Sequence, residues 1–239
     1  MNRIEQFNAQ MMSLREVFSR FYEIPDMQRD YQWDITSGDK HGQKLLDSIV
    51  SFIDEDHDNT DCYYIGTMIT YPEKGKWMVV DGQQRLTTLS LMYIAARDVF
   101  DQTYRDYPNL NLEYQFSGSK IKLSEIGDYM TQEFIGTKNK PKLLPKESSK
   151  ANYNAFINGY LHRLGSRPTF SKRTKSKFRV VQAFEMFENE FKQKFDVSTP
   201  KGIQELAYFL DNTLDGIAIN MTEVNDLAQG YRIFSSENT

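Results

Sequence analysis

The sequence has one cysteine, three histidines and no long apolar run. A single cysteine, Cys62, excludes a disulfide framework and a cysteine-based zinc site, and we expect it to be a small buried side chain beside a strand. The first residues carry no apolar leader, and no stretch approaches the roughly 18 apolar residues of a membrane span. We therefore expect a cytoplasmic protein without a membrane partner.

The charge is distributed unevenly along an otherwise ordinary globular composition. The net charge is −4, yet residues 138–179 hold 12 Lys and Arg against one acid, Glu147. Such a split is typical of a surface that binds a polyanion such as DNA, although a solvated loop with lysines on helix faces would give the same count. The DNA-binding candidates are Lys138, Lys140, Lys142, Arg167, Lys172, Arg173, Lys175 and Lys177.

The hydrophobic pattern predicts an α/β protein with a mixed sheet and many helices. Spacing of three and four residues from Ile4 to Phe18 predicts a helix over the first twenty residues. Strands are expected at 21–25, 63–70, 76–80, 112–116, 121–123 and 214–220. Further helices are expected at 39–53, 84–101, 124–134, 150–164, 177–195 and 201–210, with a last one starting near 223.

The most informative stretch is Asp81-Gly82-Gln83-Gln84-Arg85, between an apolar strand and a long helix. Gly82 allows a sharp turn, and the free N–H groups at the start of a helix suit a phosphate. Arg85 would bind phosphate oxygens, Asp81 a magnesium ion, and either glutamine an attacking water. A common Asp-Gly turn followed by a surface arginine would give the same sequence pattern. The residue spacing of a Walker loop is absent.

Four segments together resemble the N-terminal domain of GmrSD-type restriction endonucleases, which is related to the ParB/sulfiredoxin-like fold. The first is Asp81-Gly82-Gln83-Gln84-Arg85-Leu86-Thr87-Thr88-Leu89. The second is Ile24-Pro25 followed by Gln28-Arg29-Asp30-Tyr31-Gln32-Trp33. The others are Tyr64-Ile65-Gly66-Thr67-Met68 and Ile233-Phe234-Ser235-Ser236-Glu237-Asn238. They occur in the family's order and span nearly the whole chain.

The resemblance implies nucleoside triphosphate binding and magnesium-dependent hydrolysis, coupled to restriction of modified foreign DNA in phage defence. It implies a ParB-like subdomain over residues 1–107 and a mostly helical subdomain over 108–239, whose last helix returns to the pocket. The hydrolysis candidates it implies are Asp81, Gln83, Gln84 and Arg85, with Asp81 also the metal ligand. The implied nucleotide-binding residues are Gln28, Arg29, Tyr31, Trp33, Gly66, Gly82, Thr87, Thr88 and Asn238.

DNA cleavage is not expected of this chain alone. Its histidines, His41, His57 and His162, are scattered and form no His-Asn-His-like cluster. The resemblance implies a separate nuclease module of that type, beyond residue 239 or on a partner chain, since the family's last motif usually continues after its asparagine. Three readings remain open: a triphosphatase that gates the nuclease, a nucleotide- or modification-sensing DNA-binding module without turnover, and a purely structural domain. For Tyr31 and Trp33, packing without ligand contact is also open.

Overall fold

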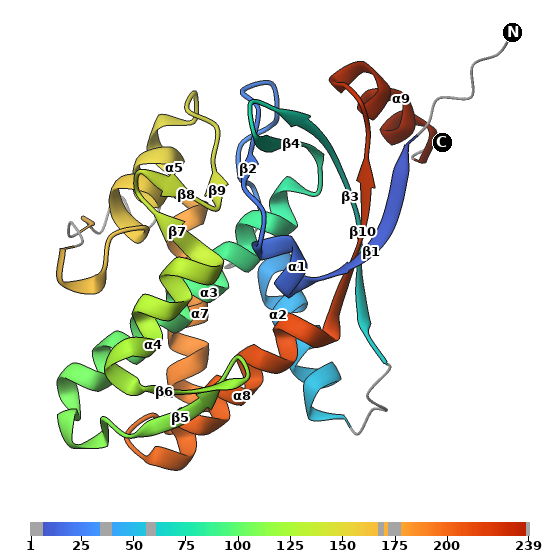
Figure 1. Cartoon of the computed structure of the whole chain (residues 1–239). Coiled ribbons are helices and arrows are strands. Elements are labelled where there is room, and N and C mark those ends of the chain that lie inside the picture. Colours follow the sequence, from blue (N-terminus) through green and yellow to red (C-terminus); the bar gives the residue numbers. More distant parts are fainter. Residues whose placement is uncertain (1–6, 34–39, 56–60, 167–169, 172–177, 238–239) are drawn as a thin grey trace, which may run out of the picture.

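The computed structural model describes residues 7–33, 40–55, 61–166, 170–171 and 178–237 and confirms the mixed α/β class (Figure 1). Its centre is a six-stranded sheet in the order β1-β10-β3-β4-β2-β9. β1 pairs antiparallel with β10, β10 parallel with β3, β3 antiparallel with β4, and β2 parallel with both β4 and β9. The sheet strands are β1(Asn8–Ser13), β2(Tyr22–Glu23), β3(Tyr63–Glu73), β4(Lys76–Asp81), β9(Leu143–Leu144) and β10(Ile217–Glu223).

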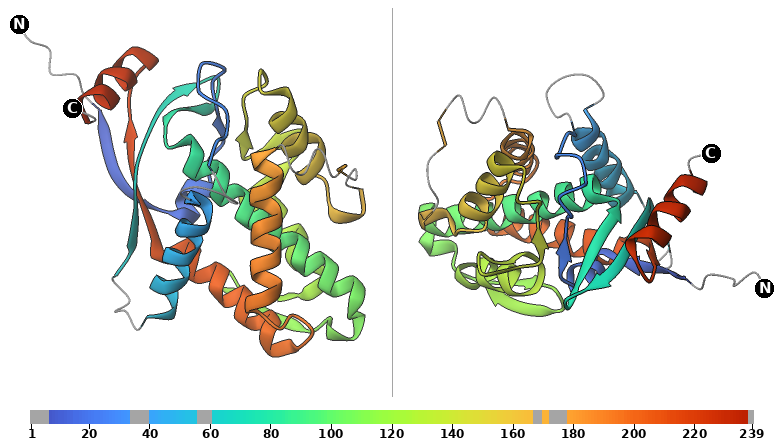
Figure 2. Two further views of the ribbon diagram at one scale, coloured as in Figure 1. Left: turned by 180° about the vertical axis from the view of Figure 1, so that it is seen from behind. Right: turned by 90° about the horizontal axis from the view of Figure 1, so that it is seen from above.

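Several helices cover one face of this sheet, and α9 lies on the other (Figure 2). The long helix α3 is buried along almost its whole length, as expected for a helix that is apolar on several sides and packs against α4 and α7. The helices are α1(Leu14–Phe18), α2(His41–Asp54), α3(Gln83–Asp106), α4(Leu123–Met130), α5(Lys150–Ala155), α7(Arg179–Lys194), α8(Pro200–Gly216) and α9(Leu227–Glu237).

Short elements complete the chain. Two β-hairpins outside the main sheet are β5(Glu113–Phe116) with β6(Ser119–Lys122), and β7(Gly136–Thr137) with β8(Lys140–Pro141). The π-helices η2(Thr131–Ile135) and η3(Phe156–Tyr160) continue α4 and α5, and the 3-10 turns are η1(Pro108–Leu110) and η4(Leu164–Ser166). With these short elements included, most of the expected helix and strand positions are confirmed.

The helix predicted over the first twenty residues is wrong for its first half. Asn8–Ser13 forms strand β1, and helix α1 begins only after Ser13. The side chain of Ser13 accepts a hydrogen bond from the Glu16 N–H, while the Glu16 carboxylate accepts one from the Ser13 N–H. This capping box fixes the helix start, and pairing with β10 holds the preceding residues extended.

The main core is continuous across residue 107. Buried side chains from β1 to β10 belong to one cluster with α3, α4, α7 and α8. β9 and β10 come from the second half of the chain, so residues of both expected subdomains, 1–107 and 108–239, contribute strands to one sheet. A smaller cluster lies on the opposite face, where Leu227 and Ile233 of α9 pack against Ile69, Tyr71, Met78, Val80 and Val224.

Two remaining expectations concern burial and apolar length. Cys62 is exposed, so the prediction of a small buried side chain is wrong: it precedes β3 rather than lying within it. Among the described residues, no helix combines the length and the apolar character needed to cross a bilayer.

Candidate functional site

The turn between β4 and α3 depends on a glycine. Gly82 has φ +90 and is the N-cap of α3, with no side chain capping the helix. A Cβ at this position would lie 2.4 Å from Cγ of Met68, so both the backbone conformation and the packing require glycine. The first N–H groups of a helix have no hydrogen-bond partner within the helix. In this protein they lie directly after the end of a central strand.

The Gln28–Gln32 segment is tied to this turn by amide side chains. Four hydrogen bonds join the two: Gln28 Nε2 to the Val80 carbonyl (2.6 Å), Gln83 Nε2 to the Arg29 carbonyl (3.1 Å), Gln84 Nε2 to the Asp30 carbonyl (3.1 Å) and the Gln32 N–H to Gln84 Oε1 (2.8 Å). The two segments predicted to face each other therefore do so. Both polar atoms of Gln84 bond to main chain, so Gln84 holds the Gln28–Gln32 segment against the turn; its role in positioning water stays a prediction.

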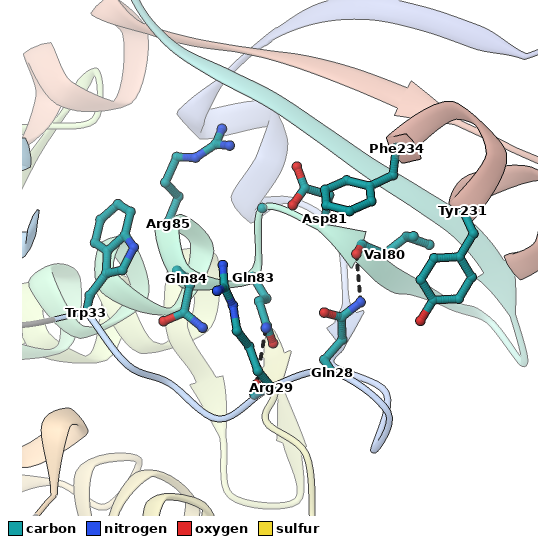
Figure 3. A pocket seen from close by; sticks show the side chains of 11 residues that line it. Gln28, Arg29, Trp33, Val80, Asp81, Gln83, Gln84, Arg85, Tyr231 and Phe234 are labelled. Atoms are coloured by element: carbon teal, nitrogen blue, oxygen red, sulfur yellow. Dashed lines mark hydrogen bonds between the residues drawn. The ribbon is translucent and has the colours of Figure 1, made fainter. Parts of the chain in front are cut away.

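A cavity of about 410 Å³ lies between these segments (Figure 3). Its size is within the usual range for small-molecule sites. Trp33 stands on one side of it, and Tyr231 and Phe234 of α9 stand on the other (Figure 3). The lining residues are Gln28, Arg29, Trp33, Val80, Asp81, Gly82, Gln83, Gln84, Arg85, Tyr231 and Phe234.

Arg85 lines the cavity but is engaged by the protein itself. Its Nη1 donates to the carbonyls of Ile65 and Thr67, at 3.0 and 2.9 Å. Between them lies Gly66, with φ +104, where a Cβ would come within 2.6 Å of the same Nη1. The close approach we expected at Gly66 is thus made by the Arg85 guanidinium, which fastens an irregular part of β3 to the first turn of α3.

Two opposite charges in the cavity have no protein partner. Within the described ranges, the Arg29 guanidinium and the Asp81 carboxylate make neither a hydrogen bond nor an ion pair. Arg29 is exposed and Asp81 is half-buried. An unpaired cation and an unpaired anion beside the start of a helix are groups that a ligand of mixed charge can satisfy.

Three predicted ligand residues lie behind the cavity instead of in it. Tyr31 is buried, and its hydroxyl shares a 2.8 Å hydrogen bond with Oγ1 of Thr88. Thr88 in turn donates to the Gln84 carbonyl, and Thr87 is buried on the side facing α5. Burial raises the pKa of Tyr31 well above its usual range. None of the three is among the described residues that line this cavity, and their contact with a nucleotide stays a prediction.

Some of the basic residues that are candidates for DNA binding lie in the described part of the chain, and the others do not. Lys140 and Lys142 each place Nζ 4.7 Å from the centre of the Phe21 ring, and Lys138 is exposed on the same hairpin, β7–β8. Burial lowers the pKa of Lys142, although nearby Glu133 opposes this. The other candidates, Arg167, Lys172, Arg173, Lys175 and Lys177, lie outside the described residues, as does Asn238.

The two aromatic residues of α9 were not among the predicted site residues. The sequence did contain the signal, because Tyr231 and Phe234 are three residues apart on a helix expected to return to the pocket. Both are exposed, at 40% and 37%, and line the cavity.

A metal ion would find few protein ligands here. Among the residues that the structure places, no group of three or more His, Cys, Asp or Glu side chains could hold a metal. Of the described residues that line the cavity, Asp81 is the one that carries a carboxylate. One carboxylate fits Mg²⁺ that arrives with phosphates, since this ion keeps water ligands and often takes only one or two protein oxygens.

Comparison with known proteins gives one match and one negative result. A family model described as "GmrSD restriction endonuclease, N-terminal domain" matches residues 10–239. No curated protein matches the chain significantly. The matched range includes every element that lines the cavity.

Proposed function

The chain belongs to the family of GmrSD restriction endonuclease N-terminal domains, and it is thereby a module of a restriction system; from this premise we propose that its cavity binds a nucleoside triphosphate with Mg²⁺ and hydrolyses it. The observation that supports the proposal most strongly is the cavity itself. It brings together the start of α3, the guanidinium of Arg29 and the carboxylate of Asp81, two charges that no other described residue pairs with.

The phosphate end of the ligand is assigned to Arg29 and the first turn of α3. A guanidinium without a protein partner keeps its full set of donors for phosphate oxygens. The helix start adds N–H groups and the positive end of its dipole. Mg²⁺, when bound, would neutralise phosphate charge, and Asp81 is the side chain that would hold it.

Gln83 is the residue we assign to water positioning. Its Nε2 is taken by the Arg29 carbonyl, whereas its Oε1 has no partner in the described part of the chain and lies at the cavity wall. An amide oxygen in this position accepts a hydrogen bond from water and orients it toward a phosphate, as glutamines do in other nucleotide hydrolases. Arg85 bonds to carbonyls of β3 and so holds β3 to the start of α3, which makes it a positioning residue.

Hydrolysis would act as a gate for cleavage of modified foreign DNA. A nuclease module of the His-Asn-His type, outside this chain or on a partner, would then be released or restrained. The lysines of β7–β8 are the described residues that would contact the DNA backbone.

The test is phosphate release from ATP and GTP with Mg²⁺, alongside calorimetric binding. Arg29→Ala should weaken binding roughly 10- to 100-fold, because a hydrogen bond to a charged group contributes about 1.5–3 kcal/mol. Gln83→Ala should retain binding and lose turnover. Lys120→Ala, which removes an exposed cation on the distant β5–β6 hairpin, serves as the matched control and should change neither. Absence of any nucleotide binding by the wild type would refute the proposal.

A binding module without turnover is the second candidate. It is favoured by Gln84, whose amide nitrogen and oxygen each bond to the main chain of the Gln28–Gln32 segment, which fits a structural role for this motif residue. In that case nucleotide would bind and shift DNA affinity, while phosphate release stayed at background in both the wild type and Gln83→Ala.

A further inference from the structure

The short segment that carries Arg29 is held from two sides. On one side, side-chain amides at the start of α3 bond to the carbonyls of Arg29 and Asp30. On the other side, the Lys146 ammonium donates a 2.7 Å hydrogen bond to the Gln28 carbonyl and forms a 2.8 Å ion pair with Oδ1 of Asp30. Three consecutive carbonyls of the segment are therefore fixed, and the lysine that fixes one of them comes from the second half of the chain.

Strand β9 brings the loop that carries this lysine beside the segment. β9 pairs parallel with β2, and the Ile24 N–H bonds to the Leu144 carbonyl at 2.9 Å. Pro145 follows and has no N–H with which to continue the ladder, so β9 ends there. The Ser148 N–H then bonds to Oδ1 of Asp26 at 3.0 Å. The loop after β9 and the loop after β2 therefore run together, which fixes where the lysine side chain begins.

The environment of the Lys146 ammonium differs from that of a surface lysine. The Lys146 side chain is 14% exposed, and its charge is compensated by a carbonyl and a carboxylate. A cation is retained in such an enclosed place only where such partners offset its lost hydration. Lys146 is not among the described residues that line the cavity. Its effect on a ligand in the cavity therefore passes through the main chain of residues 28–30.

We propose that Lys146 is a positioning residue for the phosphate end of the cavity, because it holds the backbone from which the Arg29 guanidinium extends. The inference rests on the proposed nucleotide-binding function. The Arg29 side chain is long and exposed and has no partner in the described part of the chain, so the position of its backbone determines where the guanidinium can reach. When the ammonium is removed, the segment gains freedom that a bound phosphate has to remove, and affinity falls.

A double-mutant cycle of Lys146→Met and Arg29→Ala tests this, with calorimetry of tripolyphosphate and ATP, each with Mg²⁺. Methionine keeps most of the length of the lysine side chain and removes the ammonium. Lys146→Met should weaken binding of both probes about 3- to 30-fold when Arg29 is present, which corresponds to the coupling found between residues of one hydrogen-bond network. In the Arg29→Ala protein the same change should weaken binding less than about twofold, because the group that Lys146 positions is gone.

A second variant, Lys146→Gln, keeps an N–H donor for the Gln28 carbonyl and should retain part of the affinity. It takes the place of Lys146→Met in the cycle if denaturant unfolding shows that the methionine protein does not fold. Lys150→Met is the matched control, because it removes an exposed lysine at the start of α5, and it should change neither stability nor affinity.

The outcomes separate this inference from the proposed function. Equal losses of affinity with and without Arg29 would mean that Lys146 acts by general charge or general stability, and would overturn the positioning role. Unchanged affinity in the folded Lys146 variants, together with a loss in Arg29→Ala, would also overturn it and leave the phosphate site intact. A wild type that binds neither probe would overturn the proposed function as well.

Discussion

Replacing Arg85 by alanine tests whether this arginine supports the fold or contacts the ligand. The side chain is half-buried, and its Nη1 donates to two carbonyls of β3, those of Ile65 and Thr67. Hydrogen bonds from a charged donor contribute about 1.5–3 kcal/mol each, and partial exposure reduces this. We therefore expect Arg85→Ala to lower the free energy of unfolding by about 2–4 kcal/mol.

The assay is denaturant unfolding of the ligand-free protein, followed by circular dichroism. A lower midpoint with an unchanged slope indicates lost stability. For a chain of this size, the expected loss corresponds to a melting temperature lower by roughly 4–16 °C. Arg29→Ala is the comparison, because Arg29 is exposed and has no partner in the described structure. Its free energy of unfolding should stay within about 0.5 kcal/mol of the wild type.

The reasoning fails if Arg85→Ala unfolds at the wild-type midpoint while nucleotide binding disappears. Arg85 would then contact the ligand directly, as the motif by itself suggested. A stability loss accompanied by residual binding under native conditions would agree with a positioning role.

Three other changes have outcomes fixed by the structure. Gly82→Ala should destabilise by more than about 1–3 kcal/mol, measured by thermal unfolding, because φ +90 strains any residue with a side chain and the new Cβ would lie 2.4 Å from Cγ of Met68. Stability should fall as pH rises above about 10, since burial raises the pKa of three tyrosines and folding then favours their protonated form; alkaline unfolding followed by circular dichroism checks this, and a flat profile would contradict it. The three are Tyr22, Tyr31 and Tyr93. Replacing Lys140 and Lys142 together by glutamine should reduce the salt dependence of DNA binding by about two phosphate contacts, and an unchanged slope in a salt titration would remove β7–β8 from the DNA surface.

Local pattern predicted most of the fold where elements are long. The helix after Arg85 and the pair of strands before it stand almost where the spacing placed them. The first strand could not be predicted in this way. Its residues keep helical spacing, and only the pairing of Met11 with Asn220, two hundred residues away in the chain, makes them extended. Tertiary pairing of this kind leaves no local periodicity to detect.

The sequence predicted where the site lies but not which residue has which role in it. The motifs placed Gln28, Arg29 and Asp81 together, and the structure brings them to one cavity. The sequence could not reveal that Arg85 bonds to the β3 carbonyls, because those partners are main-chain atoms that any residue carries. Nor could it separate Gln83 from Gln84, which are adjacent and chemically identical.

The position of β10 has a consequence for biosynthesis. This strand is the last of the sheet to be made, yet it lies between β1, the first, and β3. A nascent chain that has emerged only as far as residue 216 contains β1 and β3 but not β10, the strand that pairs with both. Its sheet therefore stays open between these two strands. Closure awaits the final stretch of translation, and α9 follows β10 directly. The side of the cavity that α9 forms is thus completed only when the ribosome has nearly finished this domain, so an incomplete chain presents no finished pocket.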